Sequence, residues 1–302
     1  MGTLPRISSS RAPRLVTALA VLWFGWAGTP SARAGDAVLV GAGDIASCRS
    51  SGDAATAALI RSIGGTVFTL GDNAYPDATT KQFNACYGPT WGRVKSRTRP
   101  AIGNHEYETK RAAAYWDYFG KAAGPKGKGW YSYNAGDWHV IVLNANCGKV
   151  GCRKGSEQER WLRADLAEHS RECTVAYWHQ SRFSSGRQHG NEPDVGPFWE
   201  ALYDYGAELV LSGHSHIYER FAPQTPSGRA DPDHGIRQFV VGSGGASHDR
   251  LGSARANSQV RNANTFGVLK LTLKSGSYDW EFIPQRGKSF RDSGHGSCHG
   301  RP

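Results

Sequence analysis

The segment GDNAYPD, residues 71–77, directly follows the apolar run TVFTL at residues 66–70. Such a run is typical of a buried strand, so Asp72 is expected where a strand ends and a loop begins. In open α/β sheets, ligands bind at this carboxyl edge of the strands. A carboxylate there can bridge two cations, and the phenol of Tyr75 follows three residues later. The alternative is a Gly-Asp-Asn turn without function, because these residues are common turn signals.

Four further apolar runs end in a loop that carries a side chain of the metal-ligating type. These side chains are Asp44, Asn104 with His105, His179, and His214 with His216. Oxygen donors combined with imidazoles suit iron, manganese or zinc rather than calcium. Because each loop follows a strand, we expect all five loops at one edge of one sheet, where their side chains would form a metal site.

The order of the expected elements favours an α/β fold of the mixed α+β kind. Strands and helices alternate in the first half of the chain, which indicates a parallel sheet with helical crossovers. The last third is rich in alternating apolar residues, which indicates antiparallel strands. We therefore expect two packed β-sheets flanked by helices.

Boundaries follow from the same patterns. Strands are expected at residues 37–40, 66–70, 99–102, 174–178, 208–211, 238–241, 268–273 and 278–283, helices at 54–62, 111–119, 156–169 and 198–205, and a hairpin at 129–143. A capping box, Ser156 with Glu159, is expected to open the third helix. Residues 243–263 are rich in Gly, Ser, Asn and Arg and are expected to form a long, mobile surface loop.

The first 34 residues have the pattern of a secretory signal peptide. Residues 1–14 contain arginine but no acid, residues 15–28 are apolar but too short to span a membrane, and residues 32–34 read Ala-Arg-Ala. Removing this segment leaves residues 35–302, which we expect to form one domain of a secreted protein. Loss of its four arginines lowers the formal charge from +10 to +6. The remaining excess is scattered, and no later run is apolar enough to span a membrane, so neither dedicated nucleic-acid binding nor a membrane span is expected.

Six cysteines remain after the signal peptide, and an even number in an exported chain suggests three disulfides. Fifteen connectivities are possible. Cys147 and Cys152 are the closest pair in the sequence. Cys48 and Cys86 each follow an acidic loop that a bond would connect, which leaves Cys173 to anchor Cys298 in the C-terminal tail. These last two pairings stay open, and the lack of a C-x-x-C pair argues against zinc bound by cysteines.

The strand-end motifs together resemble those of the calcineurin-like metallophosphoesterase superfamily. The matching motifs are Gly43-Asp44, Gly71-Asp72-Asn73-Ala74-Tyr75, Gly103-Asn104-His105-Glu106, His179 and Gly213-His214-Ser215-His216. The tyrosine in the second motif and the continuation at residues 217–220 are similar to the purple acid phosphatase branch. The resemblance extends over residues 37–283 and implies the four-layer fold of that superfamily. It also implies a short bacterial-type member, because the extra N-terminal β domain of plant members has no room here.

The resemblance implies two metal ions bridged by Asp72. The first ion, ferric in that branch, would be bound by Asp44, Tyr75 and His216. The second, a divalent iron, zinc or manganese ion, would be bound by Asn104, His179 and His214. Many members carry Asp-x-His in the first motif, whereas Ala46 stands here at the third position. Tyr75 would replace that histidine, and an additional anionic oxygen ligand favours a trivalent ion.

The activity implied is hydrolysis of small phosphate monoesters, as in an acid phosphatase, by attack of a metal-bound hydroxide. His105 and His189 would be the catalytic residues, able to bind phosphate or to protonate the leaving oxygen. Asn104 would also contact the substrate. Gln188 stands where plant members often have a second histidine, which weakens the expectation for His189. Arg182 would either orient the phosphate or be a solvated loop residue.

Two alternative functions remain open at this point. The first is a phosphodiesterase or nucleotide-cleaving enzyme on the same fold. The second is a secreted binding protein without catalysis, which predicts an incomplete set of metal ligands. The oligomeric state is not indicated by any pattern in the chain.

Overall fold

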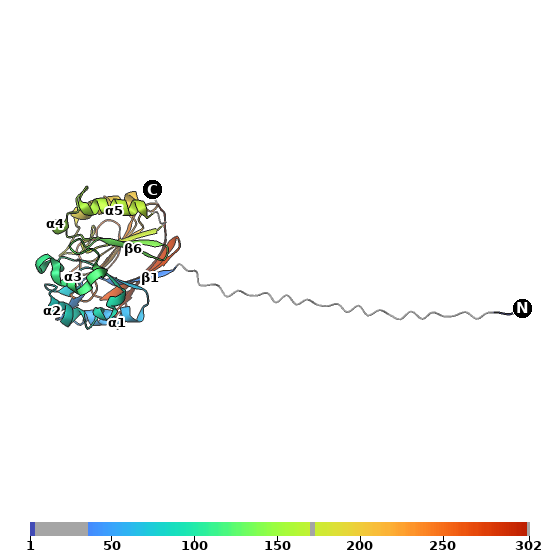
Figure 1. Cartoon of the computed structure of the whole chain (residues 1–302), viewed down its shortest axis with the longest axis horizontal. Helices are drawn as coiled ribbons and strands as arrows, with labels where there is room; N and C mark the ends of the chain where they lie inside the picture. The colour runs from blue at the N-terminus through green and yellow to red at the C-terminus, as the bar shows by residue number, and fades with distance from the viewer. Residues whose placement is uncertain (4–35, 170–172, 301–302) are drawn as a thin grey trace. The chain divides into compact units, whose positions relative to one another are not determined.

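The computed structural model describes residues 1–3, 36–169 and 173–300 (Figure 1). The predicted signal peptide, residues 1–34, therefore lies outside the described residues apart from its first three. Residues 36–300 contain two large β-sheets with helices on their outer faces, so the predicted fold class is confirmed.

The first sheet has the strand order β15-β14-β13-β1-β3-β5. Its strands are β1 (Ala37–Ala42), β3 (Thr66–Leu70), β5 (Thr98–Ala101), β13 (Gly267–Lys274), β14 (Ser277–Pro284) and β15 (Asp292–Ser297). Strands β1, β3 and β5 are parallel, and β13 to β15 add antiparallel strands beside β1. The helix α1 (Gly52–Ser62) makes the crossover from β1 to β3.

The second sheet has the order β12-β10-β11-β9-β8-β7-β6. Its strands are β6 (Tyr131–Ala135), β7 (Trp138–Val142), β8 (Cys173–Tyr177), β9 (Leu209–Ser212), β10 (Tyr218–Phe221), β11 (Arg237–Val241) and β12 (Ser258–Asn262). The four central strands β7, β8, β9 and β11 are parallel. The helices α5 (Glu157–Glu168) and α6 (Gly196–Asp204) make the crossovers on either side of β8.

Shorter elements complete the described residues. They are a two-stranded pair, β2 (Ala46–Ser47) and β4 (Ala74–Tyr75), and the helices α2 (Thr80–Gln82), continued by a π-helical turn at Phe83–Tyr87, α3 (Ala113–Phe119) and α4 (Cys147–Val150). Short 3-10 turns occupy Trp91–Arg97, His105–Glu108, Lys110–Ala112, Gly120–Ala123 and Pro193–Val195.

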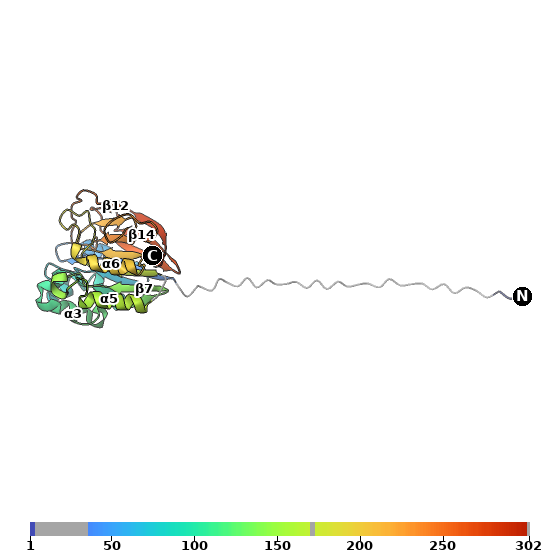
Figure 2. The same cartoon turned by 90° about the horizontal axis from the view of Figure 1, so that it is seen from above.

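Side-chain alternation along the strands explains how the layers pack. In β7, Val140 and Val142 are buried in the core shared with the first sheet, whereas Ile141 packs in the core beneath the outer helices. That outer core also contains Leu162 of α5 and Phe198 of α6. Because successive strand residues face opposite sides, one sheet contributes to both cores. Figure 1 shows α5 on one side of the strands and α1 on the other, and Figure 2 shows α6 beside α5, with which it shares the outer core, so the layers run helix, sheet, sheet, helix.

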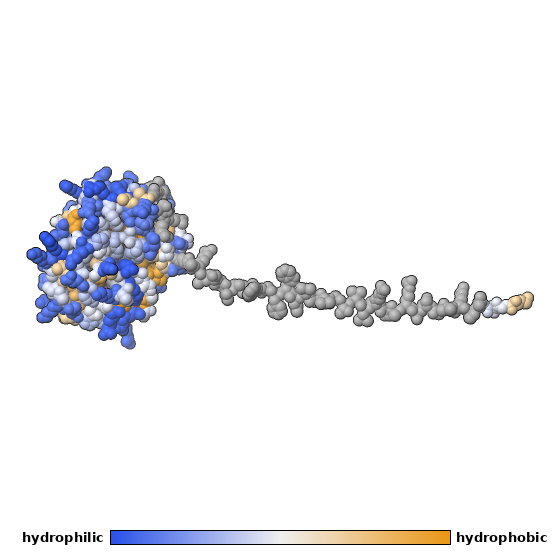
Figure 3. All heavy atoms as spheres, viewed as in Figure 1, coloured by the Kyte–Doolittle hydropathy of each residue, from blue (hydrophilic) through white to orange (hydrophobic). Residues whose placement is uncertain are grey.

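The surface of the described residues is mostly hydrophilic on the face seen in Figure 3, with small apolar spots among polar side chains. Among the described residues, Met1 and Leu251 are the large apolar side chains that are exposed. None of the helices in this part of the chain is long and apolar enough to cross a membrane.

Two local predictions differ from the structure. Residues 243–263 are not a structureless loop: they contain β12, and Ser243 and Asp249 are buried because their side chains bond to neighbouring segments. The capping box is only half formed. Ser156 accepts from the backbone N–H of Glu159, but the Glu159 carboxylate bonds to the backbone N–H of Gly155 and to Arg163 instead of returning to Ser156.

All three expected disulfides are present, joining Cys48 to Cys86, Cys147 to Cys152 and Cys173 to Cys298. Their Cα atoms lie 5.1, 5.0 and 5.6 Å apart, within the range that a disulfide can bridge. None of the six cysteines is free.

Candidate metal centre

The five strand-end loops meet in one place, but they come from two sheets. The loops after β1, β3 and β5 of the first sheet carry Asp44, Asp72 and Asn104, whereas those after β8 and β9 of the second sheet carry the three histidines. The expectation of a single sheet edge was therefore wrong. Backbone hydrogen bonds join the two edges: the N–H of Gly43, after β1, donates to the carbonyl oxygen of Val241 in β11, and the N–H of Gly244, after β11, donates to that of Gly43.

Tyr75 lies at the centre of one group of donors. Its phenol oxygen is 2.8 Å from Oδ1 of Asp44, 2.9 Å from Oδ2 of Asp72 and 3.1 Å from Nε2 of His216. His216 Nε2 also lies 3.3 Å from Oδ1 of Asp44. Burial, together with the charges of Asp44 and Asp72, raises the pKa of the Tyr75 phenol well above its usual range. The phenol is therefore protonated here and donates to the two carboxylates.

A second group of donors surrounds His179. Its Nε2 is 3.1 Å from Oδ1 of Asn104, 3.2 Å from Oδ2 of Asp72 and 3.2 Å from Nδ1 of His214. Asp72, His179 and His214 bring one ligand atom each within 4.8 Å of one another, close enough to hold one ion. The Oδ2 atom of Asp72 contacts both Tyr75 and His179, so it is shared by the two groups.

The backbone around these donors is strained. Asp44, Asp72 and His214 have φ angles of 60°, 50° and 69°, in the left-handed region that non-glycine residues rarely adopt. Strain of this kind persists only where the surrounding structure holds it, and it gathers at functional sites.

Gly103 is required at its position, because an added Cβ would lie 2.1 Å from Oδ1 of Asp72.

A backbone carbonyl and an exposed hydroxyl hold two of the imidazoles in place. His179 Nδ1 lies 2.7 Å from the carbonyl oxygen of Leu70, and His216 Nδ1 lies 2.6 Å from Oγ of Ser247. Such contacts orient an imidazole and leave its other nitrogen for a ligand. Ser247 was not predicted: it lies in the Gly/Ser-rich segment that follows β11, where no strand-end signal marks it.

Glu106 connects two of the loops. Its carboxylate accepts hydrogen bonds from the backbone N–H groups of Asp72 (3.0 Å), Asn73 (2.7 Å) and Gly103 (2.6 Å). Burial and the charge of Asp72 raise the pKa of Glu106 to about 7, although the N–H donors act in the opposite direction. Glu106 therefore supports the loops that carry Asp72 and Asn104.

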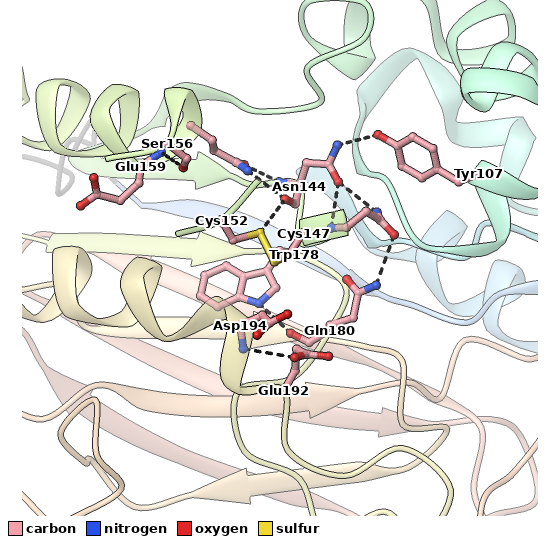
Figure 4. Close-up of a disulfide and its surroundings, with 12 residues drawn as sticks. Tyr107, Asn144, Cys147, Cys152, Ser156, Glu159, Trp178, Gln180, Glu192 and Asp194 are labelled. Carbon is pink, nitrogen blue, oxygen red and sulfur yellow. Dashed lines mark hydrogen bonds between the residues drawn. A yellow bond between two sulfur atoms is a disulfide. The ribbon is translucent and has the colours of Figure 1, made fainter. Parts of the chain in front are cut away.

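A polar network on the second sheet reaches the same loops (Figure 4). Asn146 donates from Nδ2 to the carbonyl oxygen of Gly103, next to Asn104, and its Oδ1 accepts from Gln180, next to His179. Figure 4 shows that the Cys147–Cys152 disulfide lies beside this network. Neither Asn146 nor Gln180 was predicted, because neither residue carries a motif of its own.

The two buried carboxylates are held in their charged form. Burial alone would raise the pKa of Asp44, but the charge and hydrogen bond of His216 outweigh it and lower the pKa. Burial would also raise the pKa of Asp72, and the contacts with His179 and His105 outweigh it and hold that pKa well below its usual range. Asp44 and Asp72 are 0% and 1% exposed, so both negative charges depend on nearby cationic groups.

The imidazoles differ in their preferred charge. Burial would lower the pKa of His179, but Asp72 outweighs it and raises the pKa to about 9. Burial and the neighbouring charges of His179 and His189 lower the pKa of His214 to about 3. Without an ion, His179 is therefore protonated and His214 is neutral, and Nε2 of His179 faces Nδ1 of His214.

The remaining predicted site residues fall into two places. The ring of His105 lies against that of Tyr75 in a tilted arrangement, with ring centroids 4.5 Å apart, and its Nε2 lies 3.7 Å from Oδ2 of Asp72. The ring of His189 lies 4.2 Å from that of His214. Arg182 is not brought to the centre: its guanidinium donates to the carbonyl oxygen of Pro226 and lies over the ring of Phe183.

Hard oxygen donors and imidazoles gathered at the edges of two packed sheets define a metal-dependent hydrolase of the metallophosphoesterase class. A family model described as calcineurin-like phosphoesterase matches residues 35–218. The chain belongs to this family, which confirms the family prediction.

The chain is similar in sequence and in structure to purple acid phosphatases. Purple acid phosphatase 15 of Arabidopsis thaliana is 34% identical over 173 residues, which are 51% of this chain and 32% of that protein. The chain thus spans about a third of that relative's length. The structure resembles a purple acid phosphatase from yellow lupin seeds with a TM-score of 0.73 at 19% identity, covering 88% of this chain and 54% of that one. It also resembles GAP50, the anchor in the inner membrane complex of Plasmodium, with a TM-score of 0.68 at 13% identity over 87% and 89% of the two chains.

Proposed function

We propose that residues 35–302 form one catalytic domain, a purple acid phosphatase-like enzyme that hydrolyses phosphate monoesters at a centre of two metal ions. The observation that carries this proposal is the position of Asp72. Its Oδ2 atom contacts the group around Tyr75 and the group around His179 at the same time. A carboxylate shared in this way is suited to bridge two ions.

The donor set fits two ions of different kinds. Asp44, Asp72, Tyr75 and His216 would hold the first, and three oxygen ligands that can be anionic suit a ferric ion. Asp72 would share the second ion with Asn104, His179 and His214, a mixed set of amide, carboxylate and imidazole donors that suits divalent iron, zinc or manganese.

When bound, the two ions would supply charge neutralisation on the phosphoryl group and a water of lowered pKa. The chain's own residues would bind the ester and move protons around it. The Nδ1 atom of His105 contacts the carbonyl oxygen of Pro76, which leaves its Nε2 on the side of Asp72. His189 lies beside His214, and the hydroxyl of Ser215 donates to the backbone carbonyl oxygen of His189. Two imidazoles therefore border the centre, one beside each donor group, and each could protonate a leaving oxygen.

Secretion is part of the proposal. All six cysteines outside the first 34 residues are paired in disulfides, and disulfides form and persist in oxidising compartments. This agrees with the signal-peptide pattern of the first 34 residues. Sequencing the N-terminus of the exported protein tests the point, and a mature chain that starts at Gly35 is the expected result.

Activity is tested with p-nitrophenyl phosphate and with its bis-ester. We expect the monoester to be hydrolysed faster, and His214→Ala to lose at least about a hundredfold in kcat/KM, because a ligand should matter no less than its supporting groups. The matched control is His295→Ala, an exposed histidine that pairs with Asp279 on the outer strands of the first sheet. A faster bis-ester reaction would instead favour the phosphodiesterase alternative.

The non-catalytic alternative deserves a direct test, because GAP50 shows that this fold can belong to a protein described as an anchor. In the present chain, the contacts among Asp44, Asp72, Tyr75 and the neighbouring donors support the catalytic role instead. Hydrolysis of neither ester by the metal-loaded protein would favour the binding role. Metal analysis of the purified protein, with two ions per chain expected, completes the test.

A further inference from the structure

A cavity of about 480 Å³ lies beside Tyr75, next to the candidate metal centre. Its walls include Ser47, Arg49, Tyr75, Pro76, Gln82 and Ser247. Two of these side chains also touch the proposed ligands: Tyr75 bonds to Asp44 and Asp72, and Ser247 bonds to His216. Its volume is within the range of small-molecule sites in proteins.

We propose that this cavity receives the leaving group of the phosphate ester and that Arg49 selects leaving groups that carry an oxyanion, such as a carboxylate. The inference rests on the proposed phosphatase function and adds a substrate class to it. Because a monoester presents its phosphoryl group to the ions, the rest of the molecule must extend into a neighbouring space. The cavity is such a space, because Tyr75 lines it and also contacts Asp44 and Asp72, which would hold the ions.

The position of His105 supports this assignment. The ring of His105 lies against that of Tyr75, and its Nδ1 contacts the carbonyl oxygen of Pro76; both Tyr75 and Pro76 form part of the cavity wall. A proton donor for the leaving oxygen has to lie where the leaving group departs. His105 thus lies at the boundary between the proposed phosphoryl position and the cavity.

The polar groups of the walls favour a negative ligand. Arg49 is the single charged side chain among the residues that line the cavity; it is exposed, and its guanidinium pairs with no acid among the described residues. The Oε1 atom of Gln82 accepts from the backbone N–H groups of Asp77 and Thr79, both at 3.0 Å. This leaves the amide nitrogen of Gln82 as a donor. The nearby exposed Asp77 and Lys81 carry opposite charges and do not line the cavity.

The walls of the cavity are cross-linked to one another. The Cys48–Cys86 disulfide ties the loop that carries Arg49 to the segment after Gln82. On the other side, Ser50 donates from Oγ to the carbonyl oxygen of Gly245 at 2.6 Å. A site held in this way loses little conformational entropy when a ligand binds, which favours selectivity.

The test compares phenyl phosphate with 3-carboxyphenyl phosphate, whose leaving groups differ in one carboxylate. In the metal-loaded enzyme, Arg49→Gln should lower kcat/KM for the carboxylated ester about fivefold, the upper range for an exposed ion pair, and should leave kcat/KM for phenyl phosphate unchanged. The matched control is Arg61→Gln. Arg61 is exposed in the last turn of α1, which leads back to the opposite edge of the sheet.

The outcomes separate this inference from the phosphatase proposal. If the wild type hydrolyses neither ester, the proposed function fails. If it hydrolyses both, and Arg49→Gln changes the two rates equally or not at all, the selectivity proposal is overturned. An equal loss in Arg61→Gln would also overturn it, because the effect would then come from net charge. Retained thermal stability in both variants excludes misfolding as the cause.

Discussion

The carboxylate of Glu106 accepts a hydrogen bond from the backbone N–H of Asp72 at 3.0 Å, although 34 residues separate them in the chain. The same carboxylate also binds the N–H groups of Asn73 and Gly103. One buried side chain therefore sets the distance between the loop that holds the proposed bridging ligand and the loop that holds Asn104.

Glu106→Gln should destabilise the protein. The amide group of glutamine would place a donor against at least one of the three N–H donors, which costs about 1–3 kcal/mol for an unsatisfied buried group. Chemical denaturation measures the loss. Glu108→Gln is the control, because Glu108 is an exposed acid on the same turn. Equal stability of the two variants would show that the Glu106 contacts contribute nothing.

Tyr75→Phe tests the identity of the first ion. If a ferric ion binds the phenolate, the pure protein absorbs visible light by charge transfer, and the variant loses that band. We expect activity to fall at least about tenfold, because one anionic ligand is lost. Tyr133→Phe, which removes a hydroxyl from β6, should keep both colour and activity. A colourless wild type that is fully active with zinc or manganese would refute the ferric assignment.

Removal of metal should lower both activity and thermal stability. Ions that bind only the folded state add about 2.7 kcal/mol at a hundredfold excess over Kd, and each kcal/mol corresponds to about 2–4 °C in Tm for a chain of 150–250 residues. Scanning calorimetry before and after dialysis against a chelator measures the shift. Addition of the metal ions alone should restore Tm and activity together. An unchanged Tm and rate after complete metal removal would contradict the proposed centre.

A contact of the C-terminal tail, between Glu208 and His299, should make the free energy of unfolding depend on pH. Buried Glu208 accepts from the backbone N–H groups of His299 and Gly300, and its Oε2 lies 3.0 Å from Nε2 of His299. Burial would lower the pKa of His299, but Glu208 outweighs it and raises the pKa. A raised pKa in the folded state stabilises the protein below the unfolded value of about 6.5, and this stabilisation is lost as the pH rises through the folded value.

His299→Gln should therefore be less stable than the wild type at pH 6 by up to about 1 kcal/mol, and the difference should shrink by pH 9. Thermal melts at both pH values measure it. His234, whose ring lies 5.8 Å from that of His299, needs its own variant, because it is a second histidine beside the same contact. A difference that does not vary with pH would rule out the ionic contribution.

The donor residues of the centre could be predicted because each follows a buried strand, and the strand at residues 66–70 was predicted with its observed bounds. The involvement of two sheets could not be predicted, since a strand-end motif does not tell which sheet its strand joins. Asp249 illustrates a further limit. Its carboxylate accepts from the backbone N–H of His216, but the two lie 33 residues apart and only the folded chain brings them together.

Strand β15 was missed for a different reason. Its sequence, DSGHGS, contains no apolar residue, so no period-2 pattern exists. It pairs with β14, where the rings of Tyr278 and Trp280 lie against Gly296 and Gly294. An added Cβ at Gly294 would lie 2.2 Å from Trp280, so the ring can pack there only because the residue of β15 is a glycine. The apolar groups in this contact come from β14, and the sequence of β15 therefore shows no sign of it.

The left-handed backbone at Asp44, Asp72 and His214 has a consequence for how such a chain can change. Glycine would adopt these φ angles at lower cost, so the sequence that folds most easily is not the one that carries the donors. Random mutation selected for folding alone should drift toward glycine at these three positions. Only selection for the reaction would retain the present residues there.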